Sequence, residues 1–539
     1  ILNFQAIHHR LPPSRQPYHT SPTVVLDEMT HLAIASSSQI AADAGAEIAE
    51  AGGNAVDAAI AASLVQLVTE TGVVSLGGGA MAVIWPPGER PVMIDGTSEM
   101  PGRHVPIERL GSGGLDVMLA YGGGTPTTVG YPSVATPGAL AAYALAAQRY
   151  GSMPWKALVE PAHAHAKDGF PLSSASERYI DHTHAGIFGW NPAALRPLQD
   201  EHGVIKRAGD MIHVDGLSGS LEVIAEQGVD AFYKGDIAQL IARDMEANDG
   251  LLGLVDLESY RPRILPALDV TLDGWHLATA AAPSVGGAVL AAMLLLVRDL
   301  EHSAWTAQMT AQLIEVQTQV MQFRMGRLDI SDELGRDIEG LLGLVESDPS
   351  ALASPSTVHT SAVDGSGLAC AITSSAGYGS GVMPPGTGIW MNNTLGEVEL
   401  NKRGFHALRP GTRIPSNMAP TTGRSPDGSV LSIGSPGADR ITTAILQTVT
   451  NFAHLGMTLQ DAVNHPRLHV EWPRGGERCV VYEPGMPVDE LEVAQRRFDA
   501  LDMYFGGVGA VHFTPPDRFD MAADARRTGG TAFRPYLSK

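Results

Sequence analysis

"STVHTSAVDGSGLACAITSS", residues 356–375, is the stretch that decides the fold of this 539-residue chain. Two β-prone runs stand on either side of an Asp-Gly-Ser-Gly turn at residues 364–367, which predicts a β-hairpin. Folding at this turn lays Thr373 to Ser375 alongside Thr357. The register decides which of those hydroxyls faces Thr357, since a slip of one residue exchanges the two faces of a strand.

A threonine at the head of this hairpin suggests a specific chemistry. The preceding residues 341–355 are polar, contain Pro and Ser, and predict an exposed linker. A linker that ends at a strand-initial threonine suits self-cleavage, in which the hydroxyl attacks the preceding carbonyl and hydrolysis of the ester frees an α-amine. That amine, with an ordinary pKa of about 7.7 to 8.0, can then serve as base for the hydroxyl of the same residue. Taken alone, the pattern also fits an ordinary threonine on an edge strand.

Composition excludes several classes of protein. The chain has 36 Lys and Arg against 58 Asp and Glu, a formal charge of -22, so we expect neither nucleic acid nor an anionic membrane as a partner. No run reaches the roughly 18 apolar residues of a membrane span. Cys370 and Cys479 lie outside any CxxC pattern, so neither a disulfide scaffold nor a thiolate zinc site is expected.

The N-terminal residues bear on location. The first 24 residues show no apolar signal-peptide core, which favours the cytoplasm. A secreted or periplasmic location stays open, because a chain that starts at Ile1 is compatible with an earlier removal of a leader.

Helices and strands alternate in blocks along the chain. Residues 36–68 predict two Ala-rich helices, the second capped by Asn54 with Asp57 three positions later. Residues 135–168, 218–248 and 288–326 also read as helical, and the chain then turns β-rich after residue 356. Helices, then strands, then a helix predict an α+β sandwich.

The segment "GSPGADR", residues 434–440, lies between a predicted strand and a predicted helix. Backbone amides at a helix start have no partner within the helix, so they can bind an anion. Pro436 fixes the turn and leaves the amides of Gly437 and Ala438 available to an oxyanion. A capped helix without such a role is the alternative.

Two H-x-H pairs, His163 with His165 and His182 with His184, lack carboxylate or thiolate partners in their pattern, so we expect no metal site. His359 shares a strand face with Thr357 and is expected to be structural, which disfavours a Ser-His-Asp type of triad.

Several motifs in serial order resemble one family, the γ-glutamyltranspeptidases of the N-terminal nucleophile hydrolase superfamily. The motifs are "AGGNAVDAAIAA" (51–62), "APSVGG" (282–287), "TVHTSAVD" (357–364), "GTGIWMNN" (386–393), "PSNMAP" (415–420), "GSPGADRI" (434–441) and "NHPRLHVEW" (464–472). The resemblance implies a four-layer αββα sandwich, cut between Ser356 and Thr357. The divisions are then an N-terminal arm (1–30), a large subunit (31–356) and a small subunit (357–539) that stay together as one intertwined unit.

The resemblance also implies roles for single residues. Thr357 takes the place of the nucleophile, Ser375 that of the family's second threonine, and Gly437 and Ala438 those of the oxyanion hole. No metal or organic cofactor is implied.

The match fails where the family binds the glutamate. Ser98 or Thr97 stands near the place of the arginine that clamps the α-carboxylate, and Arg103 comes several residues late. The places that hold the substrate's amino end fall on Ala376 or Gly377, Thr394 and Glu397, and the carboxylate-binding serine pair becomes Ser416-Asn417.

We therefore expect an N-terminal threonine hydrolase or transferase of γ-glutamyltranspeptidase type, with altered specificity for the acyl group of a small-molecule amide. A pathway-specific amidase or carbon-carbon bond hydrolase in secondary metabolism, such as antibiotic biosynthesis, is the alternative among enzymes. Restoration of ordinary specificity by Arg103, and an inactive binding or scaffold homologue, also stay open. The two subunits are each other's expected partners, and a homodimer of such heterodimers is not excluded.

Overall fold

The computed structural model describes residues 29–120, 124–298, 300, 304–345, 357–437, 439–473 and 476–537. The predicted arm at 1–30 therefore lies almost wholly outside the described residues, as do residues 346–356 of the predicted linker and Ala438. Within the described ranges, none of the helices is both long and apolar enough to span a bilayer.

Two large antiparallel sheets form the centre of the molecule. The seven-stranded sheet has the order β20 (Gly530–Leu537), β1 (Met29–Ser36), β11 (Val358–Asp364), β12 (Ala369–Ser375), β2 (Gly79–Trp85), β3 (Val92–Gly96), β8 (Arg263–Pro266). The six-stranded sheet has the order β19 (Arg518–Ala523), β18 (Gly509–Thr514), β14 (Val430–Gly434), β13 (Thr421–Arg424), β10 (Trp275–Thr279), β9 (Leu268–Leu272). Smaller sheets pair β15 (Leu468–Glu471), β16 (Cys479–Tyr482) and β17 (Gln495–Arg497), β4 (Leu115–Leu119) with β5 (Thr125–Val129), and β6 (Phe170–Pro171) with β7 (Met211–Ile212).

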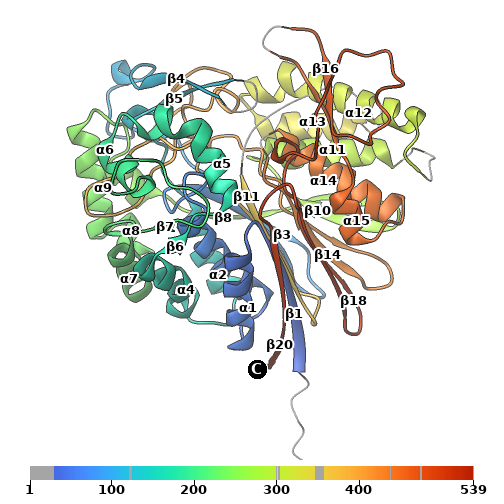
Figure 1. Ribbon diagram of the computed structural model, residues 1–539, viewed down its shortest axis with the longest axis horizontal. Helices are drawn as coiled ribbons and strands as arrows, with labels where there is room; N and C mark the ends of the chain where they lie inside the picture. Colours follow the sequence, from blue (N-terminus) through green and yellow to red (C-terminus); the bar gives the residue numbers. More distant parts are fainter. Residues whose placement is uncertain are drawn as a thin grey trace, which may run out of the picture.

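The two large sheets pack face to face, and helices cover their outer faces (Figure 1). Small and medium apolar side chains such as Ala33 and Val363 from one sheet meet Val430, Val511 and Phe513 from the other. Outside the seven-stranded sheet lie α1 (Gln39–Glu50), α2 (Ala55–Thr69), α3 (Ala139–Tyr150), α4 (Trp155–Asp168) and, further out, α5 (Ser174–Thr183), α6 (Pro192–Leu195), α7 (Leu217–Gln227), α8 (Asp230–Tyr233), α9 (Asp236–Ala247) and α10 (Leu254–Ser259). Beside the six-stranded sheet lie α11 (Val285–Val297), α12 (Ala307–Gly326), α13 (Leu334–Val345), α14 (Arg440–Val449) and α15 (Leu459–Asn464). The mixed α+β class predicted from the sequence is confirmed.

Local signals explain where several helices begin and end. The Asn54 side chain accepts from the amides of Val56 and Asp57, and the Asp57 carboxylate accepts from the Asn54 amide at 3.0 Å, so the predicted cap of α2 is confirmed. The helical stretch predicted over 218–248 is divided into α7, α8 and α9. The linker predicted from residue 341 was placed too early, because α13 continues to Val345.

The hairpin of β11 and β12 is confirmed, and its register answers the question left by the sequence. Val358 pairs with Ser374 and His359 with Thr373, so one further step places Ser375 opposite Thr357. On its other side β12 pairs with β2, where Ser375 lies opposite Gly79. Thr357 thus stands directly before a central strand, with the hydroxyl-bearing Ser375 beside it.

Candidate active site

Thr357 and Ser375 line one pocket at the end of β11 and β12. Thr357 is 2 % exposed, so it is almost fully buried beside this pocket. The other lining residues are Gly79, Thr97, Ser98, Thr394, Glu397, Leu400, Ile414, Pro415, Ser416, Asn417 and Met418. Segments far apart in the sequence therefore meet around one hydroxyl pair.

His359 lies two residues beyond Thr357, and both of its ring nitrogens are hydrogen-bonded to hydroxyl groups. Its Nδ1 lies 2.9 Å from Thr373 Oγ1, and its Nε2 lies 2.8 Å from Ser361 Oγ. Burial lowers the pKa of His359 to about 3, so the ring is neutral at ordinary pH. A neutral imidazole with both nitrogens occupied is a cross-link between β11 and β12.

Two buried polar side chains in the pocket lack partners among the described residues. Glu397 is 1 % exposed, and its Oε2 has no hydrogen-bond partner. Burial, and then the neighbouring Glu399, raise the pKa of the Glu397 carboxyl well above its ordinary value. Asn417 is 3 % exposed, and neither its Nδ2 nor its Oδ1 has a partner. Buried polar groups are normally paired, so these atoms are available to a ligand.

Arg103 lies outside this lining. Its Nη2 is 2.9 Å from Glu99 Oε2, and its Nη1 is 3.4 Å from Asp256 Oδ1. None of the described residues that line the pocket is Lys, Arg or His. The pocket therefore presents a carboxyl and an amide to a ligand, and no cation.

The wall formed by residues 414–417 is anchored at the start of α11. The Ser416 carbonyl accepts from the amides of Val285 at 2.7 Å and Gly286 at 3.2 Å. A Cβ on Gly286 would lie 2.0 Å from the Asn417 carbonyl oxygen, so only glycine permits this approach. The motif "APSVGG" thus builds the support for a pocket wall.

The turn after β14 emerges at the same end of the sandwich as Thr357. β14 ends at Gly434, where an added Cβ would lie 2.3 Å from the His359 ring. Gly437 follows with φ 130°, and a Cβ on it would lie 2.6 Å from the Gly506 Cα. The Gly507 amide donates to Ser435 Oγ at 3.1 Å, so the turn rests on residues 506–507.

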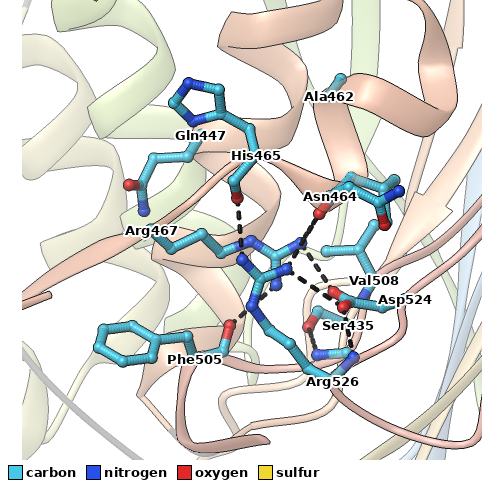
Figure 2. A network of polar contacts seen from close by, with 12 residues as sticks. Ser435, Gln447, Ala462, Asn464, His465, Arg467, Phe505, Val508, Asp524 and Arg526 are labelled. Carbon is cyan, nitrogen blue, oxygen red and sulfur yellow. Dashed lines mark hydrogen bonds and ion pairs between the residues drawn. The ribbon is translucent and has the colours of Figure 1, made fainter. Parts of the chain in front are cut away.

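A buried ion network holds those supporting residues (Figure 2). Arg467 and Arg526 converge on Asp524, at 2.8 Å and 3.2 Å. Arg467 Nη1 donates to the Phe505 carbonyl at 3.0 Å, and Asp524 Oδ2 accepts from the Val508 amide at 3.0 Å. The motif "NHPRLHVEW", which contains Arg467, therefore fixes the segment beneath the turn.

The structure brings together most of the site residues predicted from the sequence. The pocket unites Ser98, Thr357, Ser375, Thr394, Glu397, Ser416 and Asn417. Gly437 lies on the neighbouring turn, Arg103 lies behind the pocket, and Ala438 lies outside the described residues.

Sequence reasoning missed the second buried carboxyl, Glu399, whose Oε1 accepts from the Tyr378 hydroxyl at 3.0 Å. Burial raises the pKa of Glu399 as well. The two acids two positions apart in "LGEVEL" were a signal, but nothing in the sequence showed that both are buried. Within the described residues, no three His, Cys, Asp or Glu side chains are grouped as around a metal ion.

Comparisons with known proteins find one family along almost the whole length of this chain. A family model described as Gamma-glutamyltranspeptidase matches residues 41–533. The Glutathione hydrolase proenzyme of Escherichia coli (strain K12) is 28% identical over 545 residues, which cover 92% of this chain and 90% of that protein. The protein of the same description from Bacillus subtilis (strain 168) is 25% identical over 541 residues, which cover 92% of this chain and 90% of that protein.

Two solved structures share the fold. A cephalosporin acylase from Bacillus halodurans superposes with a TM-score of 0.75 at 23% identity, over 97% of this chain and 99% of that one. A structure of LmbA2991T421A superposes with a TM-score of 0.74 at 19% identity, over 96% of this chain and 100% of that one.

Proposed function

This chain belongs to the γ-glutamyltranspeptidase family, and we propose that it is a self-processed threonine hydrolase or transferase whose acyl group differs from γ-glutamyl. The observation that carries the proposal is the pocket shared by Thr357 and Ser375. Glu397 Oε2 and the Asn417 amide have no partner in its wall, and none of the described lining residues is Lys, Arg or His. The proposed fold type is the four-layer sandwich of the N-terminal nucleophile hydrolases.

Processing comes first in this proposal. Cleavage between Ser356 and Thr357 gives a large and a small subunit and frees the α-amine of Thr357. Two observations support it: the relatives are described as proenzymes, and Thr357 stands directly before β11.

Turnover then uses both functional groups of Thr357. The hydroxyl oxygen bonds to the acyl carbon while the carbon-nitrogen bond of the substrate amide breaks. The α-amine takes the hydroxyl proton and passes it to the departing amine. The acyl group is then bound to Thr357 as an ester. Water attacks the ester, releases the acid and restores the hydroxyl, and an amine in place of water completes a transfer.

The proposed oxyanion donors are the amide of Gly437, in the turn that follows β14, and that of the next residue in the sequence, Ala438. Loss of one such donor typically costs about 2.7 to 4 kcal/mol of transition-state stabilisation. The support of this turn by Ser435, Gly506 and Gly507 favours this assignment, because a preorganised donor needs a rigid backbone.

We infer an acyl group without a carboxylate. Among the described lining residues a carboxylate would meet the Glu397 carboxyl and no Lys, Arg or His, whereas an amine or another donor would pair with Glu397 and Asn417. Each hydrogen bond to a charged group contributes roughly 1.5 to 3 kcal/mol, so the charge of the acyl group decides binding. The same observation favours an amidase for another acyl group over a glutathione hydrolase.

Three p-nitroanilides that differ by one group test this inference. The 4-aminobutyryl group is γ-glutamyl without its carboxylate, and the glutaryl group is γ-glutamyl without its amine. We expect kcat/KM to be highest for 4-aminobutyryl, lower for γ-glutamyl and lowest for glutaryl, each step by about tenfold or more. Highest activity on γ-glutamyl-p-nitroanilide would remove the specificity argument.

Thr357→Ala is the control, because it lacks the hydroxyl and should show neither cleavage nor turnover. Denaturing electrophoresis of the wild type should show two pieces of unequal size. One uncut chain with no turnover of any probe would instead support a scaffold homologue.

A further inference from the structure

Arg413 lies directly behind the pocket, immediately before the wall Ile414–Asn417. Its Nε is 3.0 Å from Asp95 Oδ2, and its Nη1 is 2.7 Å from Glu99 Oε1. Its Nη2 donates to the Arg261 carbonyl. The guanidinium carbon also lies 4.3 Å from the centre of the Tyr260 ring. None of these partners is among the described residues that line the pocket.

The partners of Arg413 are the groups that fix the opposite wall, Thr97-Ser98. Asp95 Oδ1 accepts from the Thr97 amide at 3.0 Å and from the Thr97 hydroxyl at 2.6 Å. The Tyr260 hydroxyl donates to the Thr97 carbonyl at 2.7 Å. One guanidinium thus contacts both side chains that orient Thr97.

The backbone couples the two walls in the same place. The Ile414 amide donates to the Ser98 carbonyl at 3.0 Å, and the Met100 amide donates to the Thr412 carbonyl at 2.9 Å. Glu99 forms β-bridges with both Arg413 and Thr136. The walls therefore form one short antiparallel ladder, and the Arg413 side chain braces it from behind.

Charges behind the pocket are balanced among themselves. Asp95 is fully buried and Glu99 and Arg413 are each 8% exposed. Arg263 pairs with Asp95 at 2.6 Å, and Arg103 pairs with Glu99 at 2.9 Å and with Asp256 at 3.4 Å. Three arginines thus face three carboxylates, which explains why basic residues so close to the pocket present no cation to it.

We propose that Arg413 is a positioning residue of the acyl pocket, which holds the walls Thr97-Ser98 and Ile414–Asn417 at the spacing that the acyl group requires. The proposal rests on the proposed function, since it assigns the pocket to the acyl group. The fork is specific to arginine: a lysine ammonium is a compact charge and does not reproduce the planar set of donors by which Arg413 reaches Asp95, Glu99 and the Arg261 carbonyl at once.

Substitution of Arg413 should change KM and the selectivity for the acyl group. The hydroxyl and the α-amine that react both belong to Thr357, directly before β11, whereas Arg413 braces the walls beside it. A misplaced wall weakens contacts with the acyl group in the ground state and the transition state alike, and such uniform loss raises KM with kcat unchanged.

The test compares wild type, Arg413→Lys, Arg413→Met and Glu99→Gln, with 4-aminobutyryl-p-nitroanilide and butyryl-p-nitroanilide as probes. We expect complete self-cleavage in all four. For the 4-aminobutyryl probe, KM should rise about tenfold in Arg413→Lys and Glu99→Gln and further in Arg413→Met, with kcat within about twofold of wild type. The preference for 4-aminobutyryl over butyryl should shrink in the same order.

Arg424→Lys is the matched control. Its guanidinium also lies over an aromatic ring, 5.5 Å from the centre of Trp85, and donates to the Gly367 carbonyl at 2.6 Å, but it lies on β13 and does not line the pocket. This variant should match wild type in cleavage, KM and selectivity.

The outcomes separate the two proposals. An active wild type with unchanged KM in the Arg413 variants overturns the positioning role alone. Proportional loss of cleavage and kcat, or failure of both Arg413→Lys and Glu99→Gln to fold, also overturns it, because Arg413 would then support the fold in general. A wild type that neither cleaves itself nor hydrolyses any probe overturns both proposals.

Discussion

On the proposed function, Glu397 makes binding of the acyl group depend on pH. Burial, and then Glu399, raise the pKa of its carboxyl, so the carboxyl is neutral below the raised value and negative above it. An aliphatic ammonium on the acyl group stays positive throughout, because its ordinary pKa is about 10.4. The attraction between the two groups therefore appears as pH rises through the raised pKa of Glu397.

We predict that KM for 4-aminobutyryl-p-nitroanilide falls roughly tenfold as pH rises across that range. Steady-state kinetics should show a flat KM for butyryl-p-nitroanilide over the same range, since that probe has no ammonium. In Glu397→Gln the dependence should vanish. A KM that rises with pH for the amine probe would contradict the assignment of Glu397 to the acyl end.

For single residues, the sequence predicted which side chains belong to the candidate site better than it predicted how those side chains are arranged. The hairpin signal brought Ser375 near Thr357, but only the register of β11 and β12 separates Ser375 from Thr373. Arg103 could be suspected from its place in the sequence. Its pairing with Glu99 and Asp256 could not, because Asp256 is brought there by the tertiary fold.

Helix α11 is the element on which the pocket wall depends. Gly286, in its first turn, donates its amide to Ser416 and leaves no room for a side chain against the Asn417 carbonyl. An alanine there must push the wall or the helix aside.

We predict that Gly286→Ala destabilises the protein by about 1 to 3 kcal/mol and raises KM for 4-aminobutyryl-p-nitroanilide. Chemical unfolding and steady-state kinetics check the two effects. Gly219→Ala in α7 is the control: a Cβ there meets nothing within 4 Å, so the same substitution should be neutral or slightly stabilising. Equal effects of both variants would show that close approach at Gly286 is unimportant.

Helices with strong local capping signals were predictable from the sequence, whereas the division of one helical stretch into several short helices was not. The cap of α2 follows from Asn54 and Asp57, which act within one turn of helix. The division of residues 218–248 into α7, α8 and α9 depends on how those short helices pack. The apolar pattern of the sequence continues across the boundaries between them and so does not predict the division.

The two proposed subunits share both large sheets. In the seven-stranded sheet, β1 lies between β20 and β11, and β12 pairs with β2, so strands from before and after residue 357 meet at three of its ladders. In the other sheet β10 pairs with β13 across the same division. Cleavage before Thr357 therefore leaves every one of these ladders intact.

We predict that the cut protein behaves as one particle. Size-exclusion chromatography with light scattering should give the same mass per particle for wild type and for uncut Thr357→Ala, while denaturing electrophoresis separates two pieces only for wild type. Separation of the two pieces without denaturant would contradict the interleaved arrangement.

The whole-molecule class was predictable because the blocks of helix and strand are long, and membership of the γ-glutamyltranspeptidase family is confirmed. The order of strands was not predictable from pattern, since pairings such as β20 with β1 join the two ends of the described chain.

Because both pieces contribute strands to the same sheets, cleavage also changes how the molecule can refold. A single precursor folds at a rate independent of its concentration, but two separated pieces must first meet, so recovery after denaturation becomes a second-order reaction. Maturation would thus be a one-way step, after which the molecule survives by slow unfolding and not by its ability to fold again.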